Sequence, residues 1–190
     1  MATSPFEIIA GPADVYIGPV AEPFPKVDAD PAGNWVSLGE TEGGVKVTHN
    51  QSIQMLYTDQ NTGPRKAIRD QEGLTIEFDL AELTLETYAT ALNDATVTPA
   101  SGDSNAGTTR SLALYQHVDV AEFTLLVRGP SPYMDAFMDY RVPVVIQMGE
   151  PTLSFVKNDK AVFAVKWMAL VDPNAAEVED RFGALVAQDT

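Results

Sequence analysis

Glu77 and Asp79 have the spacing in this sequence that comes nearest to an acid–base site. They lie two residues apart in the strand-like segment "GLTIEFDL" (73–80), so both carboxylates are expected on one face, roughly 6–7 Å apart along the backbone. Paired carboxylates hydrolyse glycosides at such separations. Nothing else in the sequence converges on them, and a solvated strand face of an acidic protein carries such pairs routinely. We therefore expect this face to meet water or a channel and to perform no catalysis.

The other candidates for catalysis or ligand binding are isolated. His49 and His117 are the two histidines, and no H-x-x-H, H-E-x-x-H or G-x-S-x-G pattern is present. Asp28, Asp30 and Asn34 in "DADPAGN" offer oxygens to calcium, but the EF-hand spacing with a Glu at the twelfth position is missing. A turn built by Asp, Pro, Gly and Asn is favoured over an ion site. The sequence predicts no enzyme, no cofactor and no metal.

The composition indicates a strongly acidic protein of one domain. A chain of 190 residues can bury roughly 70% of its unfolded surface. The net charge of −15 excludes a general nucleic-acid-binding surface, because phosphate contacts need clustered Lys and Arg. Two interpretations of the acidity stay open: simple solubility, or a surface past which nucleic acid moves without sticking.

Targeting and redox signals are sparse. The first eighteen residues have no basic region followed by an apolar core, which predicts no signal peptide. No apolar run approaches the length of a membrane span, so no membrane anchor is expected. Cysteine is absent, which excludes disulfides, thiolate zinc sites and cysteine nucleophiles and fits folding inside a cell.

Period-two alternation predicts β-strands along most of the chain. In 73–80 the residues Leu74, Ile76, Phe78 and Leu80 should face a core, and Thr75, Glu77 and Asp79 should face water. The alternation of 45–58 changes phase partway, which indicates a bulge. Further strands are expected at 13–20, 35–39, 111–116, 122–129, 133–143, 144–149, 152–157 and 160–171. These elements predict a mainly β fold, an antiparallel two-sheet sandwich or barrel with one flanking helix.

The flanking helix should follow the strand that ends at Leu80. Its apolar residues recur at helical spacing between Leu85 and Leu92, with Thr84 as the N-cap and Asn93 closing the C-terminus. Residues 1–173 are expected to form one β-rich domain and residues 174–190 an acidic C-terminal arm. In the arm, apolar residues at helical spacing would allow a docked helix, but a frayed terminus is favoured over it.

A long polar stretch, "LYTDQNTGPRKAIRDQEG" (56–73), separates two good strand candidates. It holds few large apolar residues but includes Arg65, Lys66 and Arg69, three of the twelve Lys and Arg residues. A hairpin connection needs only two to five residues. The plain interpretation is a solvated loop. The alternative is a contact surface for an acidic partner, and the most abundant acidic partner is another copy of this chain.

Three segments together resemble the major tail tube proteins of long-tailed, siphovirus-type bacteriophages. They are "WVSLGETEGGVKVTHN", "YTDQNTGPRKAIRDQEGLTIEFDLAELTLETYATALN" and "VPVVIQMGEPTLSFVKNDKAVFAVKWMALVDP". The similarity lies in the order of elements: a Gly-rich turn into a long hairpin, a polar extended loop, a strand ending in "AELTLE" with a short helix, and a late hairpin. It covers most of residues 35–173.

The resemblance implies the phage tail tube fold, with a long extended hairpin loop, in a structural virion protein that is made in the bacterial host cytoplasm. Such proteins assemble as stacked hexameric rings through which DNA is ejected without specific binding. The implied partners are further copies of the chain, the tape measure, the tail tip and the terminator. Residues 58–72 would be a loop that reaches a neighbouring subunit or ring, disordered in the monomer and ordered on assembly. The residues implied in this contact are Asp59, Arg65, Lys66, Arg69 and Asp70, and those implied at the lumen are Thr75, Glu77 and Asp79.

Two other classes of protein stay open from the sequence. One is another phage structural β protein, such as a tail-completion or head-decoration protein, of which a completion protein would stop at a single ring. The other is a monomeric ligand-binding β-barrel or a small carbohydrate-active enzyme, which requires a cavity with convergent polar groups.

Overall fold

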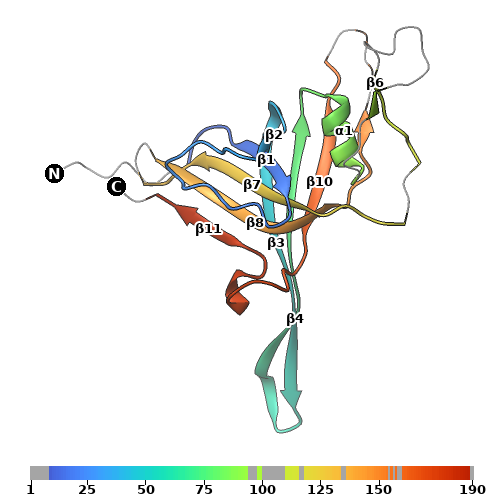
Figure 1. Cartoon of the computed structure of the whole chain (residues 1–190). Coiled ribbons are helices and arrows are strands. Elements are labelled where there is room, and N and C mark those ends of the chain that lie inside the picture. The colour runs from blue at the N-terminus through green and yellow to red at the C-terminus, as the bar shows by residue number, and fades with distance from the viewer. Residues whose placement is uncertain are drawn as a thin grey trace, which may run out of the picture.

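The computed structural model describes residues 9–93, 98–99, 110–115, 118–133, 136–153, 155, 157 and 160–188. It is mainly β and antiparallel with one short α-helix, as the sequence predicts (Figure 1). The elements are β1 (Asp14–Pro19), β2 (Val36–Ser37), β3 (Thr41–Thr58), β4 (Asn61–Leu80), α1 (Leu85–Ala91), β5 (Thr98–Pro99), β6 (Arg110–Ser111), β7 (Phe123–Pro130), β8 (Phe137–Gln147), β9 (Thr152–Leu153), β10 (Phe163–Ala169), a 3-10 turn (Val178–Asp180) and β11 (Ala184–Ala187).

The main sheet bends into two layers, one containing β7 and β11 and the other containing β10 and β4, and strand β8 belongs to both. The main sheet runs β2-β1-β7-β8-β10-β4-β3, with β11 on β8 and β9 on β10. The first part of β8 lies between β7 and β11, whereas its end, Val145–Gln147, pairs with β10. Opposite β7 the register slips between Leu125 and Phe123, which marks a bulge near Pro143. A strand that bends and changes partners in this way joins two packed layers.

The apolar core lies between these layers. It contains residues from β1, at one end of the strand order, and from β4, near the other, so the sheet must curve around it. The core face predicted for β4 is confirmed, because Leu74, Ile76, Phe78 and Leu80 are all buried, but the prediction that Thr75 faces water is wrong, because Thr75 is buried as well. Phe163 and Trp167 of β10 are also buried and are the largest fully buried side chains of the core.

Helix α1 is capped at its N-terminus and is held on the sheet at its C-terminal end and by Tyr88. The Thr84 hydroxyl accepts a hydrogen bond from the Thr87 amide at 3.1 Å, which confirms the predicted N-cap. Asn93 adopts a left-handed conformation after the helix, and its side-chain amide donates to the Gln147 carbonyl and accepts from the Gln147 amide, each at 2.8 Å. Tyr88 stacks on Phe163 with ring centroids 5.1 Å apart. No helix in the described part of the chain has the length and apolarity needed to cross a membrane.

A buried ion pair joins β7 and β8 on the face of these strands that points away from the apolar core. The Arg128 guanidinium donates to both carboxylate oxygens of Asp139, at 2.8 and 2.9 Å, and Asp139 is fully buried. The remaining Arg128 donors reach the carbonyls of Ala29 and Lys26, and Arg141 reaches the carbonyl of Pro25. Hydrogen bonding to Asp139 raises the pKa of Arg128, so the guanidinium stays charged. The network therefore fastens the Pro-rich segment 21–35 to the sheet.

Three expectations for the middle of the chain are wrong. The polar stretch 58–72 is not a loop, because residues 61–72 belong to β4, which pairs with β3 up to Thr58 and Asn61 with one irregularity opposite Tyr57 and another at Asp70. The segments 133–143 and 144–149 contribute to one strand, β8. Of the predicted strand 111–116, only Ser111 belongs to a strand, β6 (Arg110–Ser111), and the last residue lies outside the described residues.

The C-terminal tail forms a strand where a helix or a frayed end was expected. Beyond the short turn at Val178–Asp180, β11 pairs with β8 over Ala184–Ala187. Gly183 allows this return because its φ is +96° and a Cβ there would stand 1.8 Å from the Arg141 carbonyl oxygen. Close backbone approach therefore overrides the helical spacing of the tail's apolar residues.

Replacing Asp139 with Asn is expected to destabilise the fold by about 3–5 kcal/mol, because it leaves the buried Arg128 guanidinium, and the partly buried one of Arg141, without a carboxylate. Equilibrium unfolding in urea measures the effect. Glu72→Gln, which removes the exposed Arg69–Glu72 pair, is the control and should cost less than about 1 kcal/mol. Similar losses in the two variants would contradict the structural role of the buried pair.

Replacing Gly183 with Ala should release β11 from β8, because no movement of a side chain relieves the clash with the Arg141 carbonyl. Amide hydrogen exchange of residues 184–187 should rise while the rest of the sheet stays protected. Gly63→Ala is the matched control, because nothing lies within 4 Å of a Cβ at that position. Unchanged protection of β11 would refute the requirement for glycine.

Candidate self-assembly surfaces

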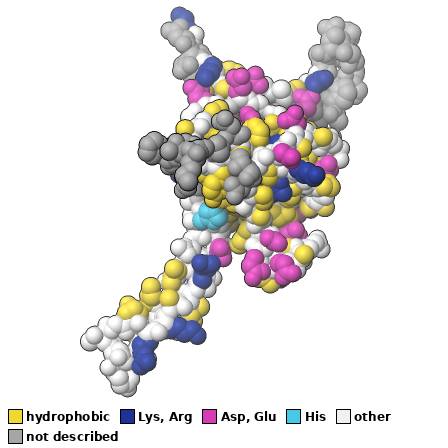
Figure 2. All heavy atoms as spheres, turned by 90° about the vertical axis from the view of Figure 1, so that its left-hand side faces the viewer, with side chains coloured by type: hydrophobic (Ala, Val, Ile, Leu, Met, Phe, Trp, Pro, Cys, Tyr) yellow, Lys and Arg dark blue, Asp and Glu magenta, His cyan; other side chains and the backbone are white. Residues whose placement is uncertain are grey.

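The outer half of the β3–β4 hairpin, residues 51–72, forms a two-stranded ribbon that projects from the body of the protein (Figures 1 and 2). The eight ribbon residues of β3 span about 25 Å, at about 3.3 Å per residue. All of its residues are exposed. A two-stranded ribbon is only marginally stable by itself, so its pairing depends on the continuation of β3 and β4 into the core.

Large apolar side chains are exposed along the ribbon. Both faces carry them, because the register places Ile53 beside Arg69 and Leu56 beside Lys66 on opposite faces. Figure 2 shows hydrophobic and basic side chains gathered together along the ribbon. The exposed apolar residues, with their exposed fractions, are Ile53 (47%), Met55 (47%), Leu56 (36%), Tyr57 (63%) and Ile68 (42%). The hydrophobic effect therefore favours covering this ribbon on both faces.

The residues predicted for the inter-subunit contact all lie on this ribbon. Asp59 is in the turn, and Asp70 is at a register shift of β4, opposite the step from Ser52 to Ile53. Arg69 pairs with Glu72 of the same strand at 3.2 Å. Arg65 and Lys66 have no ion-pair partner among the described residues. The sequence did not reveal the strand pairing that places Lys66 beside Leu56 and Arg69 beside Ile53.

The residues predicted for a lumen lie in β4 within the body, and they differ in exposure. Thr75 is only 5% exposed and hydrogen-bonds to Asn50 and to the Thr48 carbonyl. Glu77 is partly exposed, and Asp79 is exposed. In the described structure, therefore, Glu77 and Asp79 are the two of the three that can present a charge to solvent.

Glu77 lies between two lysines on the neighbouring strands. Its carboxylate oxygens contact the ammonium groups of Lys166 at 2.6 Å and Lys46 at 3.3 Å. Hydrogen bonds from Lys166 and then from Lys46 lower the pKa of Glu77 from 4.5. The row Lys46–Glu77–Lys166 crosses β3, β4 and β10, so this face of the sheet mixes both signs of charge. The order of charged residues along one strand does not reveal ion pairs between neighbouring strands.

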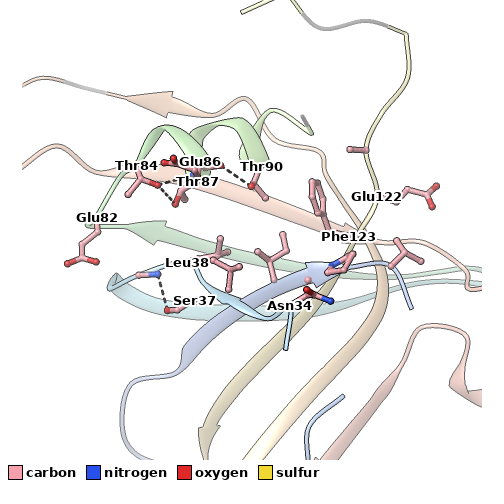
Figure 3. A pocket seen from close by; sticks show the side chains of 17 residues that line it. Asn34, Ser37, Leu38, Glu82, Thr84, Glu86, Thr87, Thr90, Glu122 and Phe123 are labelled. Carbon is pink, nitrogen blue, oxygen red and sulfur yellow. Dashed lines mark hydrogen bonds between the residues drawn. The ribbon is translucent and has the colours of Figure 1, made fainter. Parts of the chain in front are cut away.

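A pocket of about 690 Å³ lies between α1 and the β1–β2 edge (Figure 3). Ile17, Leu38 and Phe123 contribute apolar surface to it, and three threonines of the helix region form its other side. Figure 3 shows Glu82 and Glu122 at opposite ends of the pocket. The sequence offered no signal for it, because its lining comes from four separated segments. The full lining is Ile17, Gly18, Pro19, Val20, Asn34, Val36, Ser37, Leu38, Gly39, Glu82, Thr84, Glu86, Thr87, Thr90, Ala121, Glu122 and Phe123.

The isolated candidates from the sequence are not brought together. Among the described residues, no group of three or more His, Asp or Glu side chains could hold a metal ion. Asn34 bonds instead to Glu22, through its amide nitrogen and its side chain, at 3.2 and 2.9 Å. His49 is exposed on β3, and His117 lies outside the described residues.

Comparison with known proteins gives a fold likeness only. No family model matches the chain, and no curated protein matches it. One similar solved structure is a chain of the anti-feeding prophage baseplate, with 7% identity and a TM-score of 0.46 over 100% of this chain and 98% of the other. Another comes from the sheath–tube complex of the extracellular contractile injection system PVC in its extended state, with 11% identity and a TM-score of 0.41 over 100% and 93% of the two chains. Both likenesses are to components of contractile injection systems. They are too distant to establish a function for this chain.

Removing either lysine beside Glu77 is expected to raise the pKa of its carboxyl back toward 4.5, with the larger change for Lys166→Met than for Lys46→Met. Because the folded-state pKa is lowered, the pair contributes stability above pH 4.5 and loses it as the pH falls through the lowered value. An NMR titration of the Glu77 carboxyl measures the effect. Lys26→Met is the control, and equal midpoints in all variants would contradict the pairing.

Proposed function

We propose that this chain is a structural subunit that self-assembles into stacked hexameric rings, forming a tube of the phage tail type through which DNA passes. The ribbon is the observation that carries the proposal. It exposes five large apolar side chains and two unpaired cations on a chain of net charge −15. An acidic protein gains from burying such a surface against another copy of itself.

A second feature supports lateral association into rings. Strand β3 is at the end of the strand order and, in the described part of the chain, pairs only with β4, so the other edge of its body half, residues 41–50, has backbone donors and acceptors that no described strand uses. Long exposed edges are templates for pairing with another chain. The ribbon and this edge point to different neighbours, which suits contacts between rings and contacts within a ring.

The proposal assigns the exposed face of β3, β4 and β10 to the lumen, with Glu77 and Asp79 presented to the passing nucleic acid. Thr75 is buried below this face and would stabilise it through its hydrogen bonds to β3. Glu77 pairs with both Lys46 and Lys166, and the exposed Asp79 adds a second carboxylate, so these four described residues carry no net positive charge for phosphates to bind. DNA would then slide without specific binding. The proposed further partners are the tape measure, tail tip and terminator proteins of the same tail.

A monomeric ligand-binding protein is the second candidate, and the pocket is the observation that favours it. Its volume of about 690 Å³ is within the range of small-molecule sites. Such a protein would stay monomeric at every concentration and would gain stability from a ligand. A tail-completion protein would instead form single closed rings.

Electron microscopy of the purified protein over a concentration series tests the proposal. The expected result is tubes of uniform diameter with a stain-filled channel. Reversing both unpaired charges of the ribbon, in R65E/K66E, should leave the monomer folded and prevent tubes, because the variant ribbon would repel an acidic neighbour. Circular dichroism checks the fold of the variant.

A control variant, K26E/R181E, changes the net charge by the same amount at two exposed cations outside the ribbon. It should assemble like the wild type. Loss of tubes in both variants would assign the effect to net charge, and normal tubes in R65E/K66E would refute the electrostatic role of the ribbon.

A further inference from the structure

We infer that the pocket between α1 and the β1–β2 edge is the acceptor site for the ribbon of a second copy. The inference rests on the proposed self-assembly and names the surface that the ribbon meets. Apolar ribbon side chains such as Leu56 would enter the pocket, while Lys66, which lies beside Leu56 on the same face, and the neighbouring Arg65 would reach the carboxylates at its rim.

The pocket has the shape and polarity that apolar side chains require. Ile17, Leu38 and Phe123 contribute apolar surface, and the volume of about 690 Å³ has room for several side chains. The threonine hydroxyls beside it already have partners: those of Thr84 and Thr87 are 3.0 Å apart, and Thr90 donates to the Glu86 carbonyl at 2.9 Å. This wall therefore requires no polar ligand to satisfy it.

The charges of the two surfaces are complementary. Three glutamates line the pocket, and its lining includes neither Lys nor Arg. Glu86 is paired with Arg110, whereas Glu82 and Glu122 are exposed and have no ion-pair partner among the described residues. The ribbon has the matching pair of unpaired charges, Arg65 and Lys66.

Further exposed apolar surface leads into the pocket. The segment before Phe123 exposes Val118 by 97% and Val120 by 53%, and it continues directly into the pocket residues Ala121 and Glu122. An acceptor that combines this segment with the pocket would cover more of the ribbon than the pocket by itself. Burial of these valines adds a favourable hydrophobic contribution.

The positions of the two surfaces make the contact one between different copies. The ribbon projects from one end of the molecule, and α1 lies at the other (Figure 1). A chain therefore cannot place its ribbon in its own pocket. A contact between two different surfaces of identical chains is heterologous, and it propagates from copy to copy or closes a ring.

Cross-linking between single-cysteine variants tests the contact directly, because the native chain has no cysteine. Met55→Cys marks the ribbon, and Val36→Cys marks the pocket, where Val36 is 60% exposed. The two variants are mixed and treated with a short bis-maleimide, and the linked peptides are identified by mass spectrometry. The expected product joins positions 55 and 36 of different copies.

The matched control is Val178→Cys, because Val178 is 68% exposed and lies outside the pocket. We expect at least about tenfold more 55–36 than 55–178 product. Tubes in the microscope with equal yields of the two products would overturn the acceptor site and leave the proposed function standing. Monomers by microscopy with equal yields would overturn both.

Charge reversal at the rim gives a second test. In the background E82K/E122K, the Val36→Cys chain should lose its cross-link to Met55→Cys. The link should return when the Met55→Cys chain also carries R65E/K66E, because both signs are then exchanged. A 55–36 yield that does not respond to either change would overturn the ion-pair part of the inference.

Discussion

Strand β8 imposes the constraint on which the other contacts depend, because it hydrogen-bonds to β7, β11 and β10 along its 11 residues. Its first part belongs to one layer and its end to the other, and the bulge near Pro143 makes the change of partner possible. The same strand carries Asp139, whose buried pair with Arg128 fastens the segment 21–35. Its last residue, Gln147, hydrogen-bonds through its backbone to the Asn93 side chain, and this contact positions α1. One strand therefore sets where both layers, the covering segment and the pocket lie.

This arrangement leaves the outer hairpin with no role in the core. The core uses β4 only from Leu74 onward, and the paired strands continue outward for another half of their length. Strand pairing satisfies the backbone of the ribbon without burying its side chains. Exposed apolar residues on both faces are unfavourable in a monomer, and this cost is removed when a partner covers them. The stable body thus presents a preformed contact element, which limits the conformational entropy lost on association.

Charge is distributed unevenly over this acidic chain. Cations in the body are used in pairs: Arg128 with Asp139, and Lys46 and Lys166 with Glu77. The ribbon keeps Arg65 and Lys66 unpaired, whereas the pocket rim keeps carboxylates unpaired. Self-association that joins these two surfaces would neutralise charge locally while the rest of the surface stays acidic. The acidic remainder would disfavour other contacts between copies, so charge would restrict which surfaces meet.

The sequence by itself determined the elements whose signals are local. The alternation from Leu74 to Leu80 predicted a half-buried strand, and Thr84 and Asn93 marked the ends of α1, because periodicity and capping need only neighbouring residues. Only the tertiary structure decided the ribbon, since a strand exposed on both faces has no alternation to distinguish it from a loop. Gly183 directed the tail into β11 through a backbone contact with Arg141, which is distant in sequence. The burial of Thr75, the lysines around Glu77 and the pocket also depend on which strands become neighbours. That choice is made by packing across the whole chain, and no short segment contains it.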